Sequence, residues 1–213
     1  KDSNVLMLGV GAESGSARIL KYLTKDITIE QILLTARLLN KYDIIASYSF
    51  IIGVPTETQE EMMATLSLMK KIKQICPKSV FSGPQILRPY PGGSLYDLCI
   101  KKGFTIPDTF EEWGDVDFGK FGELSLRNYP WIKNKNLVLA LSTYAPAALN
   151  YNFMKNYDFK RRIYSLISLI RLRLNFWLFP YEYKIAVKVI TTLRILNLKI
   201  KKLTKNESNN AKI

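Results

Sequence analysis

The stretch Gly9–Ser16, which reads GVGAESGS, decides the fold because it joins an apolar run to a turn rich in glycine and polar groups. The run Val5–Val10 predicts a short buried strand, and Ser16–Leu23 predicts a short helix after the turn. Parallel α/β proteins bind ligands at the carboxyl ends of strands, near helix N-termini. A turn with one carboxylate, two hydroxyls and bare backbone N–H groups is therefore a candidate ligand site.

The same pattern of a strand followed by a turn returns twice downstream. Ile44–Gly53 predicts a second strand that leads into the turn Gly53–Thr58. Val80–Leu87 predicts a third strand, interrupted by Gly83-Pro84, that leads into the glycine-rich segment Pro89–Gly93.

Helices are predicted between these strands. Thr28–Gln31 is a capping box that opens a helix running to about Tyr42. Thr58–Glu61 is a second capping box, and a third helix is expected from about Ser94 to Lys102. The alternation indicates parallel βα units. Three such units do not close a barrel, and a parallel sheet needs cover on both faces. We therefore expect further strands upstream of Lys1.

The composition narrows the chemistry. The 213 residues contain no histidine and two cysteines, which excludes a histidine-based catalytic dyad or triad within the chain and a zinc site with histidine ligands. Cys76 and Cys99 are too far apart in sequence for a metal-binding pair motif, and we interpret them as reduced, buried thiols of a cytoplasmic protein. The chain shows no signal peptide and begins with Lys1 rather than Met, so we expect a piece of a longer protein.

The net charge of +13 lies entirely in the second part of the chain. Residues 1–122 carry 14 Lys/Arg and 14 Asp/Glu, whereas residues 123–213 carry 17 Lys/Arg and 4 Asp/Glu. This asymmetry predicts two parts, 1–122 and 123–213, with different roles.

The three turns, taken in order, resemble one known family. Gly9–Ser16, followed by Ile19–Lys21 and Lys25, then the turn segment FIIGVPTET at Phe50–Thr58, then PYPGGSLY at Pro89–Tyr96, is similar to the second half of a radical S-adenosylmethionine domain. The branch that often carries an upstream cobalamin-binding domain is the most similar. The resemblance extends from about Val5 to Gly103.

The resemblance implies an α/β fold: strands four to six of a partial (βα) TIM-like barrel, followed by a mainly helical, basic C-terminal extension. It implies S-adenosylmethionine and a [4Fe–4S] cluster as cofactors, with cobalamin as a further candidate. The family's cluster is bound by a Cys-x3-Cys-x2-Cys loop after the first strand, and this chain lacks that loop. We assign no metal ligand and no catalytic residue within it.

The resemblance also implies the cofactor-binding residues. Glu13 and Ser14 match contacts to the methionine and ribose portions, and a carboxylate suits an ammonium group. The alternative for this turn is a helix N-cap by Ser14 or Ser16. Ser49 would reach a ribose hydroxyl, or would fill a barrel layer.

The adenine end falls on the second and third strands. Ile51 and Gly53 match the strand that packs on adenine, where glycine permits close approach; the alternative for Gly53 is a simple turn. Leu87 to Tyr90 match the strand-six backbone that borders adenine in the family, and Arg88 would point at a carboxylate or form a surface ion pair. Glu57 and Thr58 are expected to cap the following helix.

Two basic, apolar stretches follow in the C-terminal part. Lys160–Phe179 predicts a helix that Pro180 ends, and Tyr181–Lys205 predicts a second helix. Three interpretations stay open: helices packed on the barrel, an amphipathic surface for a membrane interface, and a nucleic-acid contact, the last being the least favoured. Two arginines within a short apolar run disfavour a transmembrane span.

The sequence thus predicts the C-terminal part of a radical S-adenosylmethionine enzyme that modifies a small-molecule substrate together with the upstream part of the same protein. The reaction class is reductive cleavage to a 5′-deoxyadenosyl radical, followed by methylation or cyclisation. A non-radical (βα) barrel lyase with Glu13 as acid/base is the alternative enzyme. A membrane-surface or scaffold protein is the alternative that is not an enzyme.

Overall fold

The computed structural model describes residues 4–114, 129–154, 158–177, 181 and 185, and it begins with three strand–helix units. The elements are β1 (Met7–Glu13), α1 (Ala17–Tyr22), α2 (Ile29–Lys41), β2 (Ile45–Ile52), α3 (Gln59–Ile75), β3 (Val80–Ile86) and α4 (Ser94–Lys101). The strands form one parallel sheet in the order β1-β2-β3. The predicted alternation is confirmed, and the chain has a mixed α/β fold.

The helices begin where the sequence places them. Thr28 and Thr58 each accept a hydrogen bond from the N–H of the third helical residue, and the side chain of that residue accepts one from the threonine N–H. Both predicted capping boxes are therefore present.

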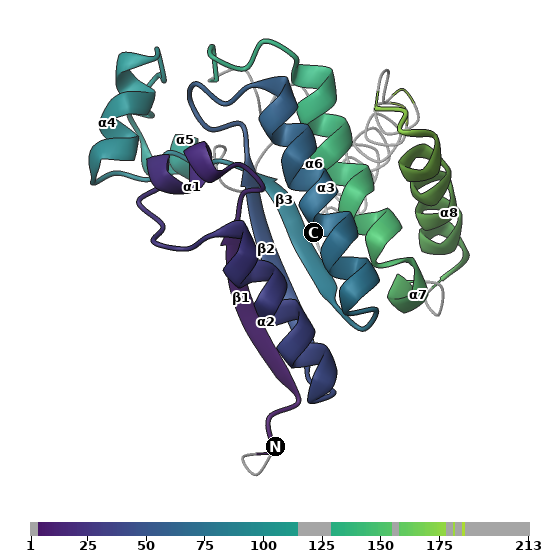
Figure 1. Cartoon of the computed structure of the whole chain (residues 1–213). Helices are drawn as coiled ribbons and strands as arrows, with labels where there is room; N and C mark the ends of the chain where they lie inside the picture. The colour runs from purple at the N-terminus through teal and green to yellow at the C-terminus, as the bar shows by residue number, and fades with distance from the viewer. Residues whose placement is uncertain (1–3, 115–128, 155–157, 178–180, 182–184, 186–213) are drawn as a thin grey trace, which may run out of the picture.

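Strand β2 separates the two faces of the sheet. Ala46, Tyr48, Phe50 and Ile52 are fully buried, and α2 and α3 lie over this face (Figure 1). The alternate residues Ile45, Ser47, Ser49 and Ile51 are only half-buried. Gly11, Ser49 and Ser82 form one row across the three strands, so this second face is lined by small and polar residues at its centre.

Strand β1 corrects one prediction. The apolar run that opens it was expected to be buried, but Val5, Leu6, Met7 and Leu8 are all exposed. Among the described residues β1 pairs with β2 alone. A strand with one neighbour buries little of its apolar surface, whatever its sequence.

Helix α6 (Lys135–Leu149) is the most buried helix in the described part of the chain. No helix was predicted over these residues. Helix α6 packs against α3 and β3 (Figure 1). The side chain of Asn150, at its C-terminal end, accepts a hydrogen bond from the Phe81 N–H at 3.0 Å and donates one to the Phe81 carbonyl at 2.9 Å. These bonds pair backbone groups of the edge strand β3, which protects that edge.

The remaining helices are α5 (Phe110–Gly114), α7 (Tyr151–Met154) and α8 (Phe159–Leu174), and α8 packs on α6. The helix predicted from Lys160 is thus confirmed, although it ends at Leu174. The second predicted helix, Tyr181–Lys205, lies outside the described residues apart from two positions. Within the described part of the chain, no helix is long and apolar enough to cross a membrane.

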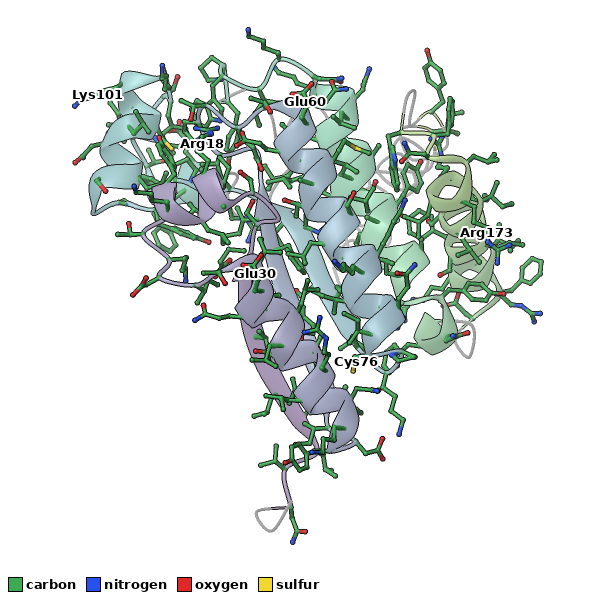
Figure 2. The ribbon with its side chains drawn as sticks, in the orientation of Figure 1. Arg18, Glu30, Glu60, Cys76, Lys101 and Arg173 are labelled. Carbon is green, nitrogen blue, oxygen red and sulfur yellow. The ribbon has the colours of Figure 1, made fainter. Side chains whose placement is uncertain are left out.

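Residues 115–128, which contain the predicted boundary between 122 and 123, also lie outside the described residues. The division into 1–122 and 123–213 stays a prediction. Figure 2 shows how densely side chains fill the space between the sheet and its helices, and one hydrophobic core includes residues from α2, β2, α3 and α6. Both cysteines are free and buried, as expected; Cys76 follows α3 (Figure 2).

Candidate functional site at the carboxyl end of the sheet

The end of β1 turns Glu13 back over the sheet. The pairing of β1 with β2 shifts register between Gly11 and Glu13, and Glu13 adopts a φ of 57°, an uncommon value for this residue type. Such bulges re-aim a side chain. Gly11 leaves the space for it, because a Cβ at Gly11 would lie 2.9 Å from Glu13 Oε1 and 4.0 Å from Ser49 Oγ. The structure therefore brings Glu13 and Ser49 together.

Lys25, which follows the first motif of the resemblance and had no assigned role, completes this group. Its Nζ lies 3.1 Å from Glu13 Oε1, and the Glu13 side chain is 11% exposed. Lys25 lies in the loop between α1 and α2, where no periodic pattern marks it. An adjacent carboxylate and ammonium can bind the two charged groups of an amino acid, through charge-assisted hydrogen bonds.

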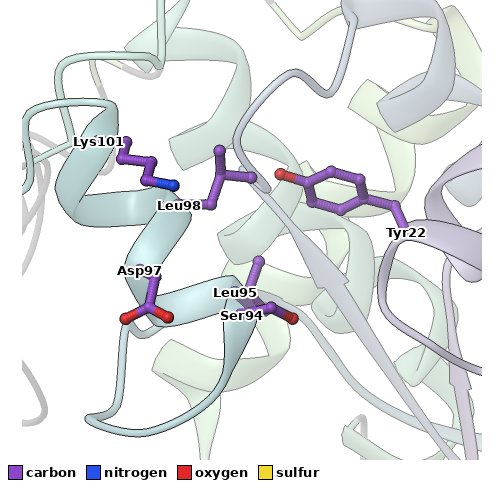
Figure 3. Close-up of a pocket in the computed structure, with 6 residues that line it drawn as sticks. All are labelled: Tyr22, Ser94, Leu95, Asp97, Leu98 and Lys101. Atoms are coloured by element: carbon purple, nitrogen blue, oxygen red, sulfur yellow. The ribbon is translucent and has the colours of Figure 1, made fainter.

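Two hollows border this end of the molecule. The larger, with a volume of about 590 Å³, is lined by Ala17, Lys21 and the segment Thr24–Glu30, so Lys25 lies between it and Glu13. The smaller, of about 320 Å³, lies between Tyr22 and α4 (Figure 3). The Tyr22 hydroxyl is buried there without a hydrogen-bond partner among the described residues, and burial raises the pKa of Tyr22.

Ser14 and Gly15 pack the turn onto α3. The Ser14 hydroxyl is buried, lies 3.3 Å from Thr65 Oγ1 and accepts a hydrogen bond from the Ser16 N–H. The Gly15 N–H donates to Thr65 Oγ1 at 2.9 Å, and a Cβ at Gly15 would lie only 2.4 Å from the Ala64 carbonyl oxygen. The described contacts of Ser14 are structural, and its role toward a cofactor stays a prediction. Ser16 is the N-cap of α1.

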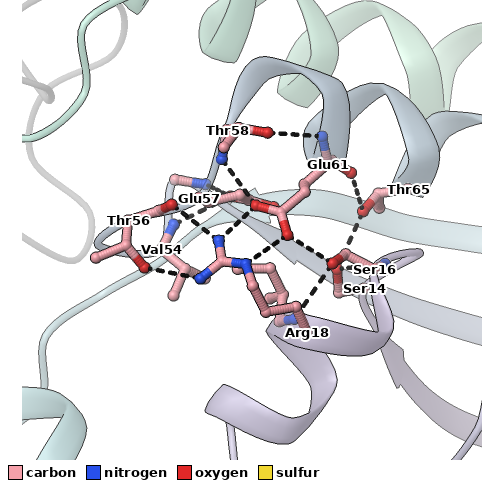
Figure 4. A network of polar contacts seen from close by, with 11 residues as sticks. Ser14, Ser16, Arg18, Val54, Thr56, Glu57, Thr58, Glu61 and Thr65 are labelled. Atoms are coloured by element: carbon pink, nitrogen blue, oxygen red, sulfur yellow. Dashed lines mark hydrogen bonds and ion pairs between the residues drawn. The ribbon is translucent and has the colours of Figure 1, made fainter.

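A polar network joins α1 to the start of α3 (Figure 4). Arg18 donates to both carboxylate oxygens of Glu61 and to the side chain and carbonyl of Thr56. The Ser16 hydroxyl also donates to Glu61, at 2.8 Å. The hydrogen bond from Arg18 is the main cause that lowers the pKa of Glu61 to about 2. The network holds the turns after β1 and β2 side by side.

Both backbone polar groups of Gly53, which follows β2, form hydrogen bonds to side chains. Its N–H donates to Glu57 Oε2 at 2.6 Å, and its carbonyl accepts from Trp131 Nε1 at 2.8 Å. Gly53 has a φ of 78°, and a Cβ there would lie 3.0 Å from Ile132 Cδ1. The positive φ favours glycine at this position, and a Cβ there would also crowd the end of the Ile132 side chain. No pattern in the sequence indicates Trp131, which lies 78 residues away from Gly53.

Glu57 supports this turn rather than capping α3, which corrects the prediction for that residue. Its Oε2 also accepts from the Val54 N–H at 3.1 Å, while Thr58 alone is the N-cap. Its Oε1 is buried without a partner among the described residues. Burial outweighs the two backbone N–H groups and raises the pKa of Glu57 to about 7.

The other predicted residues lie on β2 and just after β3. Ile51 is half-buried and packs against a small cluster that contains Leu87, Cys99 and Phe104, together with Trp131. Leu87 is buried, and its N–H donates to the Ile52 carbonyl at 2.8 Å. Arg88 is exposed. Ile51, Gly53 and Leu87 thus lie near one another, whereas the structure does not bring Arg88 into the group around Glu13 by any described contact.

The described residues hold no cluster of three or more His, Cys, Asp or Glu side chains that could bind a metal ion. Burial raises the pKa of the Cys99 thiol to about 11, so this thiol stays protonated near neutral pH. The arrangement can bind a small polar molecule but offers no ligands for an iron–sulfur cluster in the described part of the chain.

Part of this chain is similar in sequence to parts of larger known proteins. The chain is 33% identical over 107 residues to an uncharacterized methyltransferase of Pyrococcus horikoshii; the match covers 50% of this chain and 22% of that protein. It is 32% identical over 100 residues to an uncharacterized protein of Methanocaldococcus jannaschii, covering 45% of this chain and again 22% of the relative. It is 43% identical over 61 residues to a tRNA-2-methylthio-N(6)-dimethylallyladenosine synthase of Thermotoga petrophila, covering 28% of this chain and 14% of that enzyme. The chain thus matches about a fifth of the length of the first two relatives. No protein-family model matches the chain.

Proposed function

We propose that this chain is the part of a radical S-adenosylmethionine enzyme that binds the organic cofactor, and that the whole protein modifies a small molecule by a radical reaction such as methylation. The observation that carries the proposal is the Glu13–Lys25 pair, at 3.1 Å, where β1 ends. A carboxylate and an ammonium group together match the α-amino and α-carboxylate groups of the methionine portion.

The second support comes from the neighbouring strand ends. Gly53 follows β2 two residues after Ile51, and Ile51 packs in one apolar cluster with Leu87, which follows β3. The backbone at these two strand ends would lie against one face of an adenine ring. Neighbouring strands lie about 5 Å apart, so the three strand ends span roughly 10 Å, the scale of a small-molecule cofactor. Ser49 lies between these two groups, on β2, where a ribose hydroxyl would fall.

The third support comes from the relatives. Two of them have names that describe the transfer of a methyl or a methylthio group, and this chain matches parts of both. These names support an enzyme that uses S-adenosylmethionine. They agree with the resemblance of the Gly9–Ser16, Phe50–Thr58 and Pro89–Tyr96 motifs to the radical S-adenosylmethionine family.

The [4Fe–4S] cluster does not fit the described residues, because Cys76 and Cys99 are buried apart and the Cys99 thiol stays protonated. We propose that the cluster ligands, and the cobalamin site if the enzyme has one, belong to another part of the polypeptide. When bound, S-adenosylmethionine would supply a 5′-deoxyadenosyl radical. The residues of this chain would bind and orient it: Glu13 and Lys25 at the methionine end, and Ile51, Gly53 and Leu87 at the adenine end.

The exposed edge of β1 supports the partial-barrel arrangement within this proposal. Its apolar residues Met7 and Leu8 are exposed, and its outer edge has no partner strand among the described residues. An upstream parallel strand that pairs with β1 would cover both features. The three strands would then be the last three of a partial (βα) barrel, with the row Gly11, Ser49 and Ser82 facing its interior.

An NMR titration of the ¹⁵N-labelled chain tests the binding site. We expect S-adenosylmethionine to shift the amide signals of both Gly11 and Gly53. Methionine alone should shift the signals around Gly11 and Glu13, and adenosine alone those around Gly53. A chain that responds to neither half of the cofactor, or that responds only at α8, would contradict the proposal.

The coding sequence upstream of Lys1 provides a second test. The proposal requires a Cys-x3-Cys-x2-Cys motif about 70 to 100 residues before Glu13, the length of roughly three βα units. A long upstream reading frame without three closely spaced cysteines would favour a non-radical barrel enzyme instead.

A further inference from the structure

Helix α8 is oriented unlike an ordinary surface helix. The side that faces α6 contains Ser165, Ser168, Arg171 and Leu172, all buried. Arg171 packs its guanidinium between Tyr144, at 4.6 Å from the ring centroid, and Phe176, at 5.1 Å. Most of the residues that α8 buries are therefore small or polar. A helix that packs on a core normally buries its large apolar residues.

The large apolar side chains of α8 lie on its outer side. Phe159, Ile163, Leu166, Ile170 and Leu174 follow one another at spacings of three or four residues, and each is between 42% and 75% exposed. This spacing places them in one stripe along the helix. We refer to these five residues as the α8 stripe. A continuous exposed apolar stripe indicates an interaction surface, whereas single exposed apolar residues do not.

Positive charge borders the stripe. The helix sequence FKRRIYSLISLIRLRL contains no acidic residue, and Lys160, Arg161, Arg162 and Arg173 are exposed. On a helical projection, Arg162 and Arg173 fall beside one edge of the stripe and Lys160 beside the other. Figure 2 shows Arg173 projecting from the outer side of α8. The part of the chain that contains α8 also carries the whole net charge of +13.

We propose that α8 is a docking surface for a bilayer that contains anionic phospholipids, with the α8 stripe inserted among the headgroups and the basic residues on lipid phosphates. An apolar stripe with a basic border has the two properties that membrane-surface helices combine. Anionic headgroups complement the absence of acidic side chains on α8. Because the α8 stripe runs along the helix from Phe159 to Leu174, the helix would lie in the plane of the surface. This inference is independent of the cofactor site.

Vesicle co-sedimentation of the full chain tests the proposal. We expect binding to phosphatidylcholine vesicles that contain phosphatidylglycerol, weaker binding to pure phosphatidylcholine, and a fall in binding as salt rises from about 0.05 M to about 0.5 M, because the Debye length shortens to a few ångströms. The double variant Leu166→Ser/Ile170→Ser should lower the partition coefficient onto anionic vesicles by about tenfold or more, since two half-exposed apolar side chains leave the interface.

Helix α2 offers a matched control. Leu34 and Leu38 have the same four-residue spacing as Leu166 and Ile170, and their exposures of 49% and 45% match the 46% and 49% of the α8 pair. The variant Leu34→Ser/Leu38→Ser should leave vesicle binding unchanged. Arg162→Gln/Arg173→Gln should weaken binding at low salt and reduce its salt dependence.

Four outcomes would overturn the proposal. The first is wild-type protein that does not sediment with anionic vesicles at low salt. The second is an α8 double variant that binds as well as the wild type. The third is an α8 double variant whose melting temperature falls by several degrees, which would mean that this protein's own chain covers the stripe. The fourth is a wild-type dimer in light scattering that the α8 double variant converts to a monomer, which would identify a second copy as the partner.

Discussion

The turn after β1 and the turn after β2 start from similar sequence and use their glutamates in opposite ways. Each turn contains glycine and one glutamate at the end of a strand. Glu13 folds back over Gly11 and pairs with Lys25, whose side chain is 46% exposed, so this pair can exchange its partners for those of a ligand. Glu57 instead accepts from the backbone of its own turn, with its Oε1 enclosed.

The role of each carboxylate therefore depends on the groups that it contacts and not on its position after a strand. An exposed ammonium leaves Glu13 available to bind a ligand, whereas two backbone N–H groups make Glu57 a structural brace. The first turn offers charge, and the second offers a rigid backbone surface beside apolar residues. Substitutions at Gly15, Glu57, Glu13 and Trp131 test this contrast.

Gly15→Ala should have the largest effect, because it disrupts the close packing of the turn after β1 against α3. The new Cβ would lie 2.4 Å from the backbone carbonyl oxygen of Ala64, which cannot move without displacing the helix. We expect the free energy of unfolding to fall by about 3 kcal/mol or more in urea denaturation. Gly9→Ala is the control, since nothing lies within 4 Å of a Cβ there. Equal losses in the two variants would show that close packing at Gly15 is not the reason.

The second turn should make stability depend on pH. The pKa of Glu57 is raised from 4.5 to about 7, so the folded state favours the protonated carboxyl group. Its contribution is fully present below pH 4.5 and is lost as pH rises through about 7. Relative to Glu57→Gln, the wild type should therefore lose up to about 3 kcal/mol of unfolding free energy between acid pH and about pH 8.

Denaturation of both proteins across this pH range measures that difference. Gln keeps an oxygen that can accept hydrogen bonds from the Gly53 and Val54 N–H groups, but it has no proton to lose as pH rises. A difference between the two proteins that is constant with pH would mean that the pKa of Glu57 is the same in the folded and unfolded states, and that the contrast with Glu13 is smaller than we infer.

Glu13→Gln should weaken the binding of S-adenosylmethionine by about tenfold, because Gln keeps a neutral acceptor and a hydrogen bond to an ionised carboxylate contributes roughly 1.4 kcal/mol more than one to a neutral oxygen. Calorimetric titration of the whole protein measures this. The affinity for adenosine should not change. Glu60→Gln, an exposed carboxylate in the first turn of α3, is the matched control. A loss of the same size in Glu60→Gln would point to a general effect of charge.

Trp131→Phe should have the smallest effect. It keeps an aromatic ring but removes the N–H that holds the Gly53 carbonyl at 2.8 Å, a loss of about 1 kcal/mol. Adenosine binding should weaken by a few-fold, and methionine binding should not change. Trp113→Phe is the control, since Trp113 packs on Phe104 in the same apolar cluster, whereas the indole that donates to the Gly53 carbonyl is that of Trp131. Equal weakening of both ligands in Trp131→Phe would assign Trp131 to general stability.

Much of the fold follows from interactions within a few residues. The Thr28 and Thr58 capping boxes, the apolar spacing of α2 and α3 and the three strand runs are all local patterns, and the structure has each of them. Helix α6 was missed because its apolar residues do not lie on one side: Leu137 to Leu141 are all buried. A helix enclosed on every side loses the periodic pattern that marks an amphipathic one.

The candidate site was only partly predictable for the same reason. Glu13, Ser49, Ile51, Gly53 and Leu87 were identified from motifs that follow strands. Lys25 was named within the first motif but without a role, and Trp131 was not named at all, because each meets its partner through the tertiary fold. The role of Glu57 could not be read either, since capping a helix and bracing the preceding turn require the same residue at the same place.

The sequence by itself determined the order of strands and helices, where most helices begin, and the basic character of the C-terminal part, because those depend on local hydrogen bonds and on composition. Only the tertiary structure decided which polar groups remain available. In the fold, Glu13 lies beside an exposed lysine, whereas Glu57 is enclosed. Ser14 packs on α3, and the apolar side of α8 faces outward. Burial and charge pairing depend on residues that are distant in the chain, so no local pattern could specify them.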